Sequence, residues 1–348
     1  MIHGGQLNQV AAQFNIPMDK WLDLSTGIAP FSYPIPEIPQ RIWQDLPTIP
    51  NSLIAAAKHY YQADFCWPLA GSQSLIEKLP TLWENKIQLK NASFEKHVYL
   101  PKVGYKEHQQ AWFKAGYQLH FYQTDLPSEI EPNSVVVVIN PNNPLTDIFS
   151  IKQLSELQQY CNQQHALLII DEAFADIFSA DFSFVPHINN DALSNTLVLR
   201  SVGKFFGLAG LRVGFVCSNE FWFKLIKQSS GPWAVNGPAL FITENALNNT
   251  EWHSIQNQRL QLQSKAMQTL ISRYLPIKRI EANALFITVF LDNAANIYQQ
   301  LCRKALYVRL TDEQDSLRFG IANEQQLIQL KLILSTANLT VEEEASLI

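Results

Sequence analysis

The chain has 348 residues, of which 47% are hydrophobic and 16% charged, and its formal net charge is −5. This length predicts one large and one small domain, or two of similar size, and the composition is that of a globular protein with a substantial core. The acidic balance argues against a protein that binds nucleic acid or an anionic membrane surface.

The N-terminal sequence lacks the basic and apolar regions of a signal peptide. The longest apolar runs of the whole chain, such as 284–291, are far shorter than the roughly 20 residues that span a bilayer. We therefore expect a soluble, cytoplasmic protein. The four cysteines, Cys66, Cys161, Cys217 and Cys302, are widely spaced and form no CxxC or Cys/His cluster. This spacing predicts buried free thiols and neither a metal site nor a disulfide framework.

Four apolar runs predict buried strands, at residues 135–139, 166–170, 196–200 and 212–217. The first run ends at the turn-rich segment 140–144. A stretch of helical period follows Ser150, which is placed to cap it, and separates the first two runs. Strands buried on both faces and separated by helices indicate a largely parallel sheet. Residues 48–250 are therefore expected to form a large α/β domain.

The pattern changes after residue 250. A long amphipathic helix is expected at 251–274, followed by a strand at 284–290, further short elements to 321 and a last helix from Glu324. This order predicts a smaller α+β domain at 251–348. Residues 1–47 are expected to form an N-terminal arm and part of that small domain. The tail after Thr340 is expected to be frayed.

The acidic pair Asp171-Glu172 directly follows an aliphatic run, as in the Walker B element of an ATPase. That interpretation requires an upstream GxxxxGK[ST] motif, which the sequence lacks. The Gly203-Lys204 pair comes later and is followed by Phe205. The glycine-rich run 207–214 does not match GxGxxG, and it precedes a strand instead of opening a helix.

A second interpretation fits better. A carboxylate at the carboxyl end of a buried parallel strand lies where open α/β sheets bind ligands, and it can keep a pyridine nitrogen protonated. Lys204 follows the predicted strand 196–200 in a Ser-Val-Gly-Lys turn. A lysine beside such a ring can form a Schiff base. The pattern therefore favours a pyridoxal 5′-phosphate (PLP) enzyme.

Three motifs occur in a familiar order: Asn140-Pro141-Asn142-Asn143-Pro144, Asp171-Glu172-Ala173-Phe174, and the run from Arg200 to Phe215. Together they resemble the PLP-dependent class I/II aminotransferase family, fold type I. The resemblance extends from His3 to about Asn323. It implies PLP as the cofactor and a large domain with a mainly parallel central sheet, joined to a smaller α+β domain.

The resemblance also implies roles for individual residues. Lys204 would form the Schiff base and act as general acid or base, and Asp171 would pair with the pyridinium nitrogen. Asn143 would donate a hydrogen bond to the ring oxygen. Ser201 and Arg212 would bind the cofactor phosphate, together with the backbone at the helix start Gly71-Ser72-Gln73. Ser201 as a simple turn residue and Arg212 as a surface ion-pair residue are the alternatives.

Two aromatic residues are also implied in the cofactor site. Tyr105 occupies the place at which the family stacks an aromatic ring on the cofactor, and His108 would lie near Asp171. The alternatives are a core-packing role for Tyr105 and a structural, hydrogen-bonded role for His108.

The segment 316–321 resembles the family segment whose arginine binds the substrate carboxylate, which assigns that role to Arg318. Arg309 would bind a second anionic group, or none. Gly4, Gly27 and Asn143 are further expected substrate-binding residues. His3 is expected to bind a substrate phosphate together with Arg309, with a disordered terminal residue as the alternative.

Several segments narrow the resemblance to one branch of the family. The run from His3 to Leu7, the run from Trp21 to Pro30 and the run from Gly231 to Pro238 resemble cobalamin-pathway threonine-phosphate decarboxylases and their CobC-type relatives. Phe174 replaces the tyrosine of typical aminotransferases, as in the decarboxylase-type relatives. Leu46-Pro47 stands where many members have a Tyr-Pro pair, whose phenol reaches the partner subunit's cofactor phosphate, and Leu46 has no hydroxyl to make that contact.

The expected activity is decarboxylation of O-phospho-L-threonine to (R)-1-amino-2-propanol O-2-phosphate in cobalamin biosynthesis. The alternative is an aminotransferase of the histidinol-phosphate or aromatic type, since small shifts of the anionic anchors can change the reaction on an identical core. A catalytically inert scaffold with the same fold is a third hypothesis, which the intact Lys204, Asp171, Asn143 and Arg212 argue against. A homodimer is expected by analogy with the family.

Overall fold

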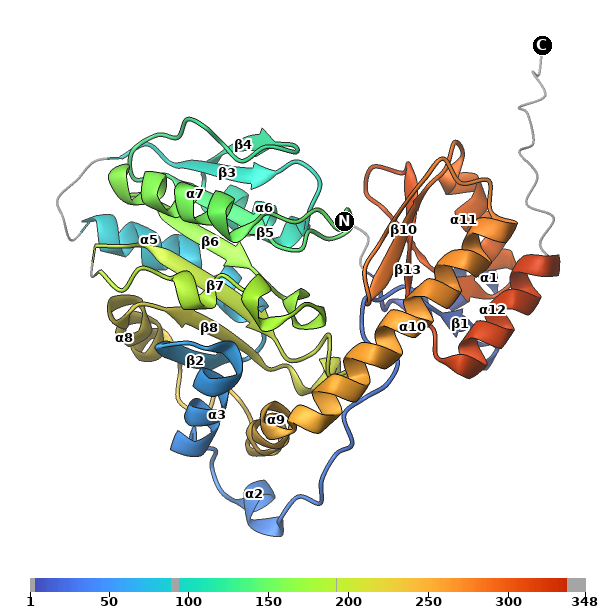
Figure 1. The fold of residues 1–348 in the computed structure, drawn as a ribbon, viewed down its shortest axis with the longest axis horizontal. Coiled ribbons are helices and arrows are strands. Elements are labelled where there is room, and N and C mark those ends of the chain that lie inside the picture. The colour runs from blue at the N-terminus through green and yellow to red at the C-terminus, as the bar shows by residue number, and fades with distance from the viewer. Residues whose placement is uncertain (1–3, 89–93, 192, 337–348) are drawn as a thin grey trace. The chain divides into compact units, whose positions relative to one another are not determined.

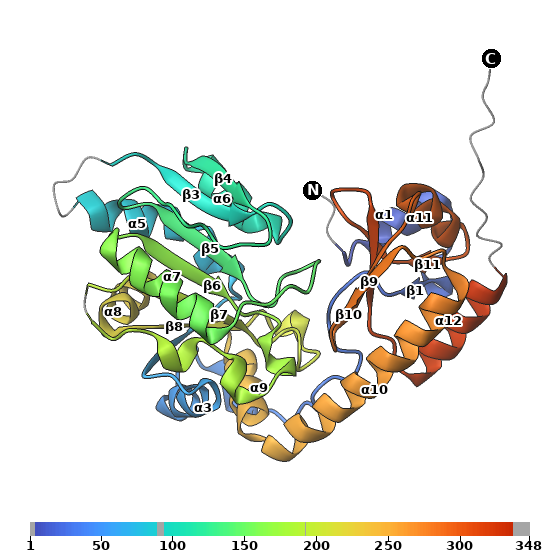
Figure 2. The ribbon, with the colours of Figure 1, turned by 45° about the horizontal axis from the view of Figure 1, so that its top comes forward.

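The computed structural model describes residues 4–88, 94–191 and 193–336. The described chain divides into two compact units, Ser32–His253 and the combination of residues 4–31 with 254–336. Both units are visible in Figures 1 and 2. The predicted boundaries lay at 47/48 and 250/251, so the first one differs clearly from that of the structure.

Residues 32–47 lie with the larger unit because their backbone and side chains bind to it. The Tyr33 N–H donates to the Phe206 carbonyl at 2.8 Å, and the Tyr33 hydroxyl donates to the Asn245 carbonyl at 3.2 Å. The Ile42 carbonyl lies so close to Gly237 that a Cβ there would be 2.8 Å away. Composition and periodicity cannot predict these contacts, because the residues that make them are distant in sequence.

In the described part of the larger unit, seven strands form one sheet in the order β2-β8-β7-β6-β5-β3-β4. β3 pairs in parallel with β4 and β5, β5 with β6, and β6 with β7. The expected α/β fold with a mainly parallel sheet is confirmed. The strands are β2 (Phe65–Leu69), β3 (His97–Pro101), β4 (Gln118–Tyr122), β5 (Val135–Ile139), β6 (Leu167–Asp171), β7 (Thr196–Ser201) and β8 (Gly214–Ser218).

The four predicted strands of this sheet are confirmed to within two residues at each end as β5, β6, β7 and β8. Every residue of β5 and β6 is buried, as expected for central strands covered on both faces. β8 runs antiparallel to both β7 and β2. The link from β7 to β8 contains turns and a short 3₁₀ segment but no α-helix, whereas a parallel connection usually crosses over through a helix.

Helices cover both faces of the sheet (Figures 1 and 2). Trp83, Trp112 and Trp222 from three helices form one core cluster with alternate residues of the strands. α7 packs against β6, and Ser150 caps its start as predicted, in a capping box with Gln153. The helices are α2 (Gln40–Gln44), α3 (Asn51–Tyr61), α4 (Gln73–Ile76), α5 (Leu79–Gln88), α6 (Lys106–Lys114), α7 (Ile151–Gln163), α8 (Glu220–Ser229) and α9 (Gly237–Asn248).

The smaller unit is α+β. Its described strands form a four-stranded antiparallel sheet in the order β12-β13-β10-β9 and a parallel pair of β1 and β11. The strands are β1 (Leu22–Asp23), β9 (Arg279–Ala282), β10 (Phe286–Phe290), β11 (Leu306–Tyr307), β12 (Arg309–Leu310) and β13 (Ser316–Gly320). The helices are α1 (Leu7–Phe14), α10 (Thr250–Tyr274), of which the first residues belong to the larger unit, α11 (Ala294–Arg303) and α12 (Glu324–Thr336).

The predicted long helix and last helix are confirmed as α10 and α12. Within the described residues, no helix combines the length and the apolar character that crossing a membrane requires. The tail after Thr340, which we expected to be frayed, lies outside the described residues.

Candidate active site

A pocket lies at the carboxyl ends of β5, β6 and β7, within the larger unit. It encloses about 680 Å³, including space open to solvent. Open parallel sheets bind their ligands at this edge. Nine of the predicted cofactor-site residues line the pocket: Gly71, Ser72, Gln73, Tyr105, Asn143, Asp171, Ser201, Lys204 and Arg212.

Asp171, the last residue of β6, provides a buried carboxylate in this pocket. Its side chain accepts a hydrogen bond from His108 Nε2 at 2.8 Å and another from the Ala173 N–H at 3.0 Å. Because a carboxylate only accepts, Nε2 of the fully buried His108 carries the proton in this pair. His108 thus contacts Asp171, as the sequence predicted, but it does not line the pocket itself.

Lys204 lies in the turn that follows β7, and its side chain enters the same pocket as Asp171. Its Nζ lies 5.4 Å from the centroid of the Phe174 ring. Gly203 permits the tight turn, since a Cβ there would lie 3.1 Å from the Ala209 Cα. The pocket therefore brings together an amine and a carboxylate from two neighbouring strands.

One end of the pocket is built for an anion. Gly71 has φ +73°, and a Cβ at this position would lie 2.8 Å from a terminal nitrogen of Arg212. Ser72 and Gln73 begin α4, where the first backbone N–H groups have no acceptor within the helix. Ser201 and Arg212 complete this end. A guanidinium, a hydroxyl and backbone N–H groups are the donors that a phosphate accepts.

Tyr105 and Asn143 lie in the same pocket and are held by their neighbours. The Tyr105 hydroxyl donates to Gln73 Oε1 at 3.3 Å, and Gln73 Nε2 donates to Glu107 at 2.9 Å. The backbone N–H of Asn143 donates to the Asn142 side chain at 2.8 Å. Tyr105 is thus a pocket residue and not simply part of the core.

The predicted substrate-binding residues Gly4, Gly27, Arg309 and Arg318 belong to the smaller unit. Arg309 and Arg318 are direct partners in the β12–β13 pair, and both are buried. An Arg318 nitrogen donates to the Ser25 carbonyl at 2.8 Å, and Arg309 lies 3.8 Å from Asp312. Burial and the positive charge of Arg309 lower the pKa of Arg318 to about 9.

Gly4 and Gly5 lie beside Ser25, whose carbonyl accepts the hydrogen bond from Arg318. The Gly5 N–H donates to the Ser25 hydroxyl at 2.8 Å. A Cβ at Gly4 would collide with the Ser25 carbonyl. Gly27, two residues after Ser25, is buried. His3 lies outside the described residues. The smaller unit therefore joins Gly4 and Arg318 through Ser25.

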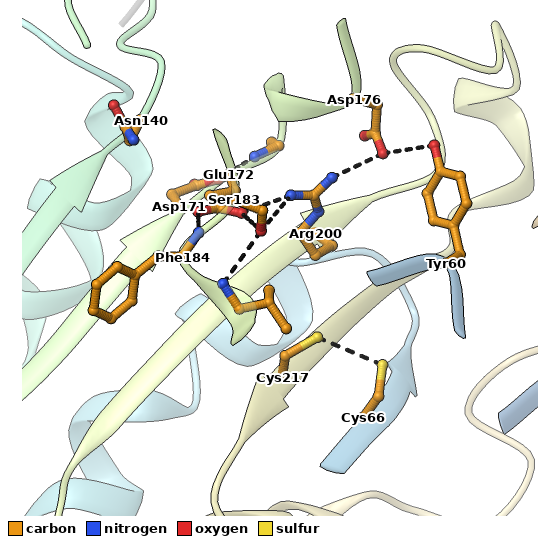
Figure 3. Close-up of polar contacts among 12 residues, drawn as sticks. Tyr60, Cys66, Asn140, Asp171, Glu172, Asp176, Ser183, Phe184, Arg200 and Cys217 are labelled. Atoms are coloured by element: carbon orange, nitrogen blue, oxygen red, sulfur yellow. Dashed lines mark hydrogen bonds and ion pairs between the residues drawn. The ribbon is translucent and has the colours of Figure 1, made fainter. Parts of the chain in front are cut away.

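A buried ion cluster lies next to the pocket, and the sequence motifs did not predict it (Figure 3). Arg200 donates to Glu172 at 2.6 Å and to Asp176 at 2.8 Å, and all three are buried. Burial raises the pKa of Glu172, an effect that the Arg200 charge opposes. Arg200, a charged residue at the end of an apolar strand run, was the available signal, because such residues are rarely buried without a partner.

A sequence model of the family described as "Aminotransferase class I and II" matches residues 44–329. The chain belongs to this family. The match includes all the pocket residues above and both arginines of β12 and β13.

Two curated members of the family are similar to the chain over nearly its whole length. A threonine-phosphate decarboxylase from Pseudomonas aeruginosa is 34% identical over 330 residues, which cover 93% of each chain. A threonine-phosphate decarboxylase from a Sinorhizobium species is 33% identical, with 92% of this chain and 93% of the relative covered.

Solved structures of the family share the fold at low sequence identity. The L-threonine-O-3-phosphate decarboxylase from Porphyromonas gingivalis has a TM-score of 0.68 and 15% identity, with 85% of this chain and 94% of that chain covered. The histidinol-phosphate aminotransferase from Sinorhizobium meliloti, solved in complex with pyridoxal-5′-phosphate, has a TM-score of 0.74 and 13% identity, with 96% and 95% covered.

The pocket of this aminotransferase-family chain suits PLP in its donor set. One cavity contains the Lys204 amine and the buried Asp171 carboxylate, which accepts two hydrogen bonds. The same cavity contains the hydrogen-bond donors around Gly71 that suit a phosphate. The Gly71 position leaves no room for a Cβ beside Arg212, so the backbone and the guanidinium approach the same point. The residues present therefore fit the cofactor.

Proposed function

We propose that the chain is a PLP-dependent lyase that decarboxylates O-phospho-L-threonine to (R)-1-amino-2-propanol O-2-phosphate in cobalamin biosynthesis. The observation that carries the proposal is its 33–34% identity, over more than nine-tenths of the chain, to two threonine-phosphate decarboxylases. The pocket and the arginine pair supply the groups that this reaction needs.

In this proposal the pocket of the larger unit holds the cofactor. Arg212, Ser201 and the backbone at Ser72 and Gln73 line the pocket and would bind the cofactor phosphate, and Asn143 would donate to the ring oxygen. Tyr105 would stack on the ring, and Lys204 would be the amine that holds the cofactor. When bound, PLP supplies a conjugated ring that accepts the electrons of a bond broken at the substrate Cα.

Asp171 would pair with the ring nitrogen of the bound cofactor and favour the protonated form of that nitrogen. Its two hydrogen-bond donors, His108 and the Ala173 N–H, fix the carboxylate in one orientation. Low exposure strengthens the attraction between this carboxylate and a positive ring, because water does not screen it. His108 acts through Asp171 and is a positioning residue.

The arginine pair of the smaller unit suits a substrate with two anionic groups. Arg318 binds the carboxylate, for which a planar fork gives two parallel hydrogen bonds. Arg309, with His3 and the backbone near Gly4 and Gly27, binds the phosphate. Because the environment of Arg318 penalises its positive charge, a bound anion is stabilised there more than at an exposed arginine.

The position of these anchors determines which bond at Cα breaks. For decarboxylation the bond from Cα to the carboxylate carbon breaks, CO₂ leaves, and a proton takes its place on Cα. Lys204 is the group in the pocket that delivers this proton. The centroid of the Phe174 ring lies 5.4 Å from the Lys204 amine, and Phe174 offers that amine no hydroxyl, unlike a tyrosine at that position.

The second candidate is an aminotransferase of the histidinol-phosphate or aromatic type. It is favoured by the fold shared with the histidinol-phosphate aminotransferase from Sinorhizobium meliloti. A common catalytic core serves both reactions, so the two differ in where the substrate is held.

The deciding experiment incubates the purified protein with PLP and O-phospho-L-threonine. Release of CO₂ without any keto-acid acceptor supports the decarboxylase, and Lys204→Ala should abolish it. Turnover that depends on a keto-acid acceptor would instead establish the aminotransferase. An absorbance band of bound PLP, lost in Lys204→Ala, tests the cofactor assignment separately.

We also propose that the enzyme is a cytoplasmic homodimer. The four free, buried cysteines agree with a reducing compartment. The dimer rests on the resemblance to the family, in which subunits complete each other's sites. Size-exclusion chromatography with light scattering tests the proposed dimer. A mass near 39.6 kDa would indicate a monomer and contradict the proposal.

A further inference from the structure

A buried cluster of charged residues lies beside the pocket without lining it. Arg200 lies at the carboxyl end of β7, Glu172 follows β6, and Asp176 lies in the 3₁₀ segment Ala175–Ile177. All three are less than 10% exposed. Figure 3 shows the Arg200 guanidinium between the two carboxylates. Burying a charge is costly unless it is paired and hydrogen-bonded, so these three side chains constrain one another's positions.

The guanidinium spans the two ends of one short segment. One terminal nitrogen donates to Glu172 Oε2 at 2.6 Å, and the other donates to Asp176 Oδ1 at 2.8 Å. Between these residues lie Ala173 and Phe174, which both line the pocket. Ala173 also donates its N–H to Asp171. The Arg200 fork therefore fixes the span of the segment that carries this side of the pocket.

Arg200 is also adjacent in the chain to the residues that line the other side of the pocket. Ser201 follows it directly, and Lys204 lies in the next turn. Side chains alternate across a strand, so Arg200 and Ser201 point to opposite faces of the sheet. The Glu172 N–H donates to the Leu199 carbonyl at 2.9 Å, which continues the β6–β7 ladder to this point. One side chain thus links the segment of Asp171 to the segment of Lys204.

We propose that Arg200 is a positioning residue that sets the separation between the Asp171–Phe174 segment and the Ser201–Lys204 turn. It acts on the cofactor without touching it, and this role rests on the proposed binding of PLP in the pocket. Loss of the fork lets the two segments move apart, which weakens PLP binding and changes the environment of its ring.

Glu172 and Asp176 also accept hydrogen bonds from residues other than Arg200, so variants can distinguish the Arg200 fork from these other contacts. Glu172 also accepts from the Ser183 hydroxyl at 2.6 Å and from the Phe184 N–H at 2.7 Å. Asp176 Oδ1 also accepts from the Tyr60 hydroxyl at 3.0 Å, while Asp176 Oδ2 has no hydrogen-bond partner among the described residues. An asparagine at 176 can therefore keep both bonds of Oδ1 and place its amide nitrogen at the Oδ2 position.

This geometry supplies a matched set of variants. Arg200→Lys keeps the charge but replaces the planar fork by a single ammonium. Asp176→Ala removes one branch of the fork, and Asp176→Asn retains it without the charge. Tyr60→Phe removes a partly buried hydrogen bond to Asp176 and leaves both branches of the fork, so it controls for a general loss of stability.

The experiment uses the full-length protein, with and without PLP. PLP affinity is measured by titrating the apoprotein, and the position and pH titration of the absorbance band are recorded for each holoprotein. Hydrogen exchange of the apoprotein reports the mobility of 171–176 and 201–204 without the cofactor. Release of CO₂ by the wild-type protein is measured in parallel, so that a wrong reaction assignment is distinguished from a wrong role for Arg200.

Arg200→Lys and Asp176→Ala should each weaken PLP binding at least 10-fold, shift the band or its titration, and accelerate exchange in both segments. Asp176→Asn and Tyr60→Phe should stay within about threefold of the wild-type PLP affinity. The proposal is overturned if Asp176→Ala binds PLP as the wild type does, or if Asp176→Asn or Tyr60→Phe loses as much affinity as Asp176→Ala. Should Arg200→Lys fail to fold, the Asp176 pair decides by itself.

Discussion

Substituting Gly71 by alanine tests the phosphate end of the pocket most directly. The residue has φ +73°, and the new methyl group would lie 2.8 Å from a terminal nitrogen of Arg212, closer than packed atoms approach. The guanidinium must therefore move away from the point that it shares with the backbone of Gly71. Loss of one charge-assisted hydrogen bond to a phosphate is worth about 2 kcal/mol. At 1.36 kcal/mol for each factor of ten, PLP should bind about 30-fold more weakly.

The left-handed backbone adds a separate effect on stability. An L-residue with a Cβ in this conformation costs about 1–2 kcal/mol relative to glycine. Gly116 provides the matched control, because it has φ +81° and nothing within 4 Å of the Cβ position. Gly116→Ala should lower the free energy of unfolding to a similar degree without changing PLP affinity. Equal PLP dissociation constants for Gly71→Ala and Gly116→Ala, measured by absorbance titration, would refute the steric argument.

Three further outcomes are expected. Asp171→Asn should lower kcat for CO₂ release at least about 100-fold with a smaller change in KM, since it removes the charge opposite the ring nitrogen while retaining the shape; a KM effect alone would contradict this role. Arg309→Ala should reduce kcat/KM for O-phospho-L-threonine far more than for threonine, and equal losses would show that Arg309 does not bind the phosphate. The cysteines should react with a disulfide reagent at neutral pH only after unfolding, because burial raises the pKa of Cys161 to about 12 and that of Cys302 to about 11. A thiol that titrates rapidly in the native protein would contradict their burial.

The sequence by itself determined the elements whose signals are local. The aliphatic runs that became β5 and β6 are so apolar that they can lie only in the middle of a sheet, and both are buried throughout. The Ser150 cap located the start of α7 because the serine hydroxyl and the Gln153 N–H are close in sequence. The order of the three motifs around Asn143, Asp171 and Lys204 was sufficient to identify the family, since these residues meet wherever their strands lie side by side in parallel.

Tertiary structure decided the contacts between residues that are distant in sequence. The antiparallel direction of β8, the packing of residues 32–47 on the larger unit and the cross-strand pairing of Arg309 with Arg318 each depend on which segments meet. The Glu172–Arg200–Asp176 cluster belongs to the same class, because a charge in an apolar strand reveals that a partner is required but not which residue provides it. Hydrophobic periodicity records whether a side chain is buried, whereas the identity of its neighbour follows from strand order and register.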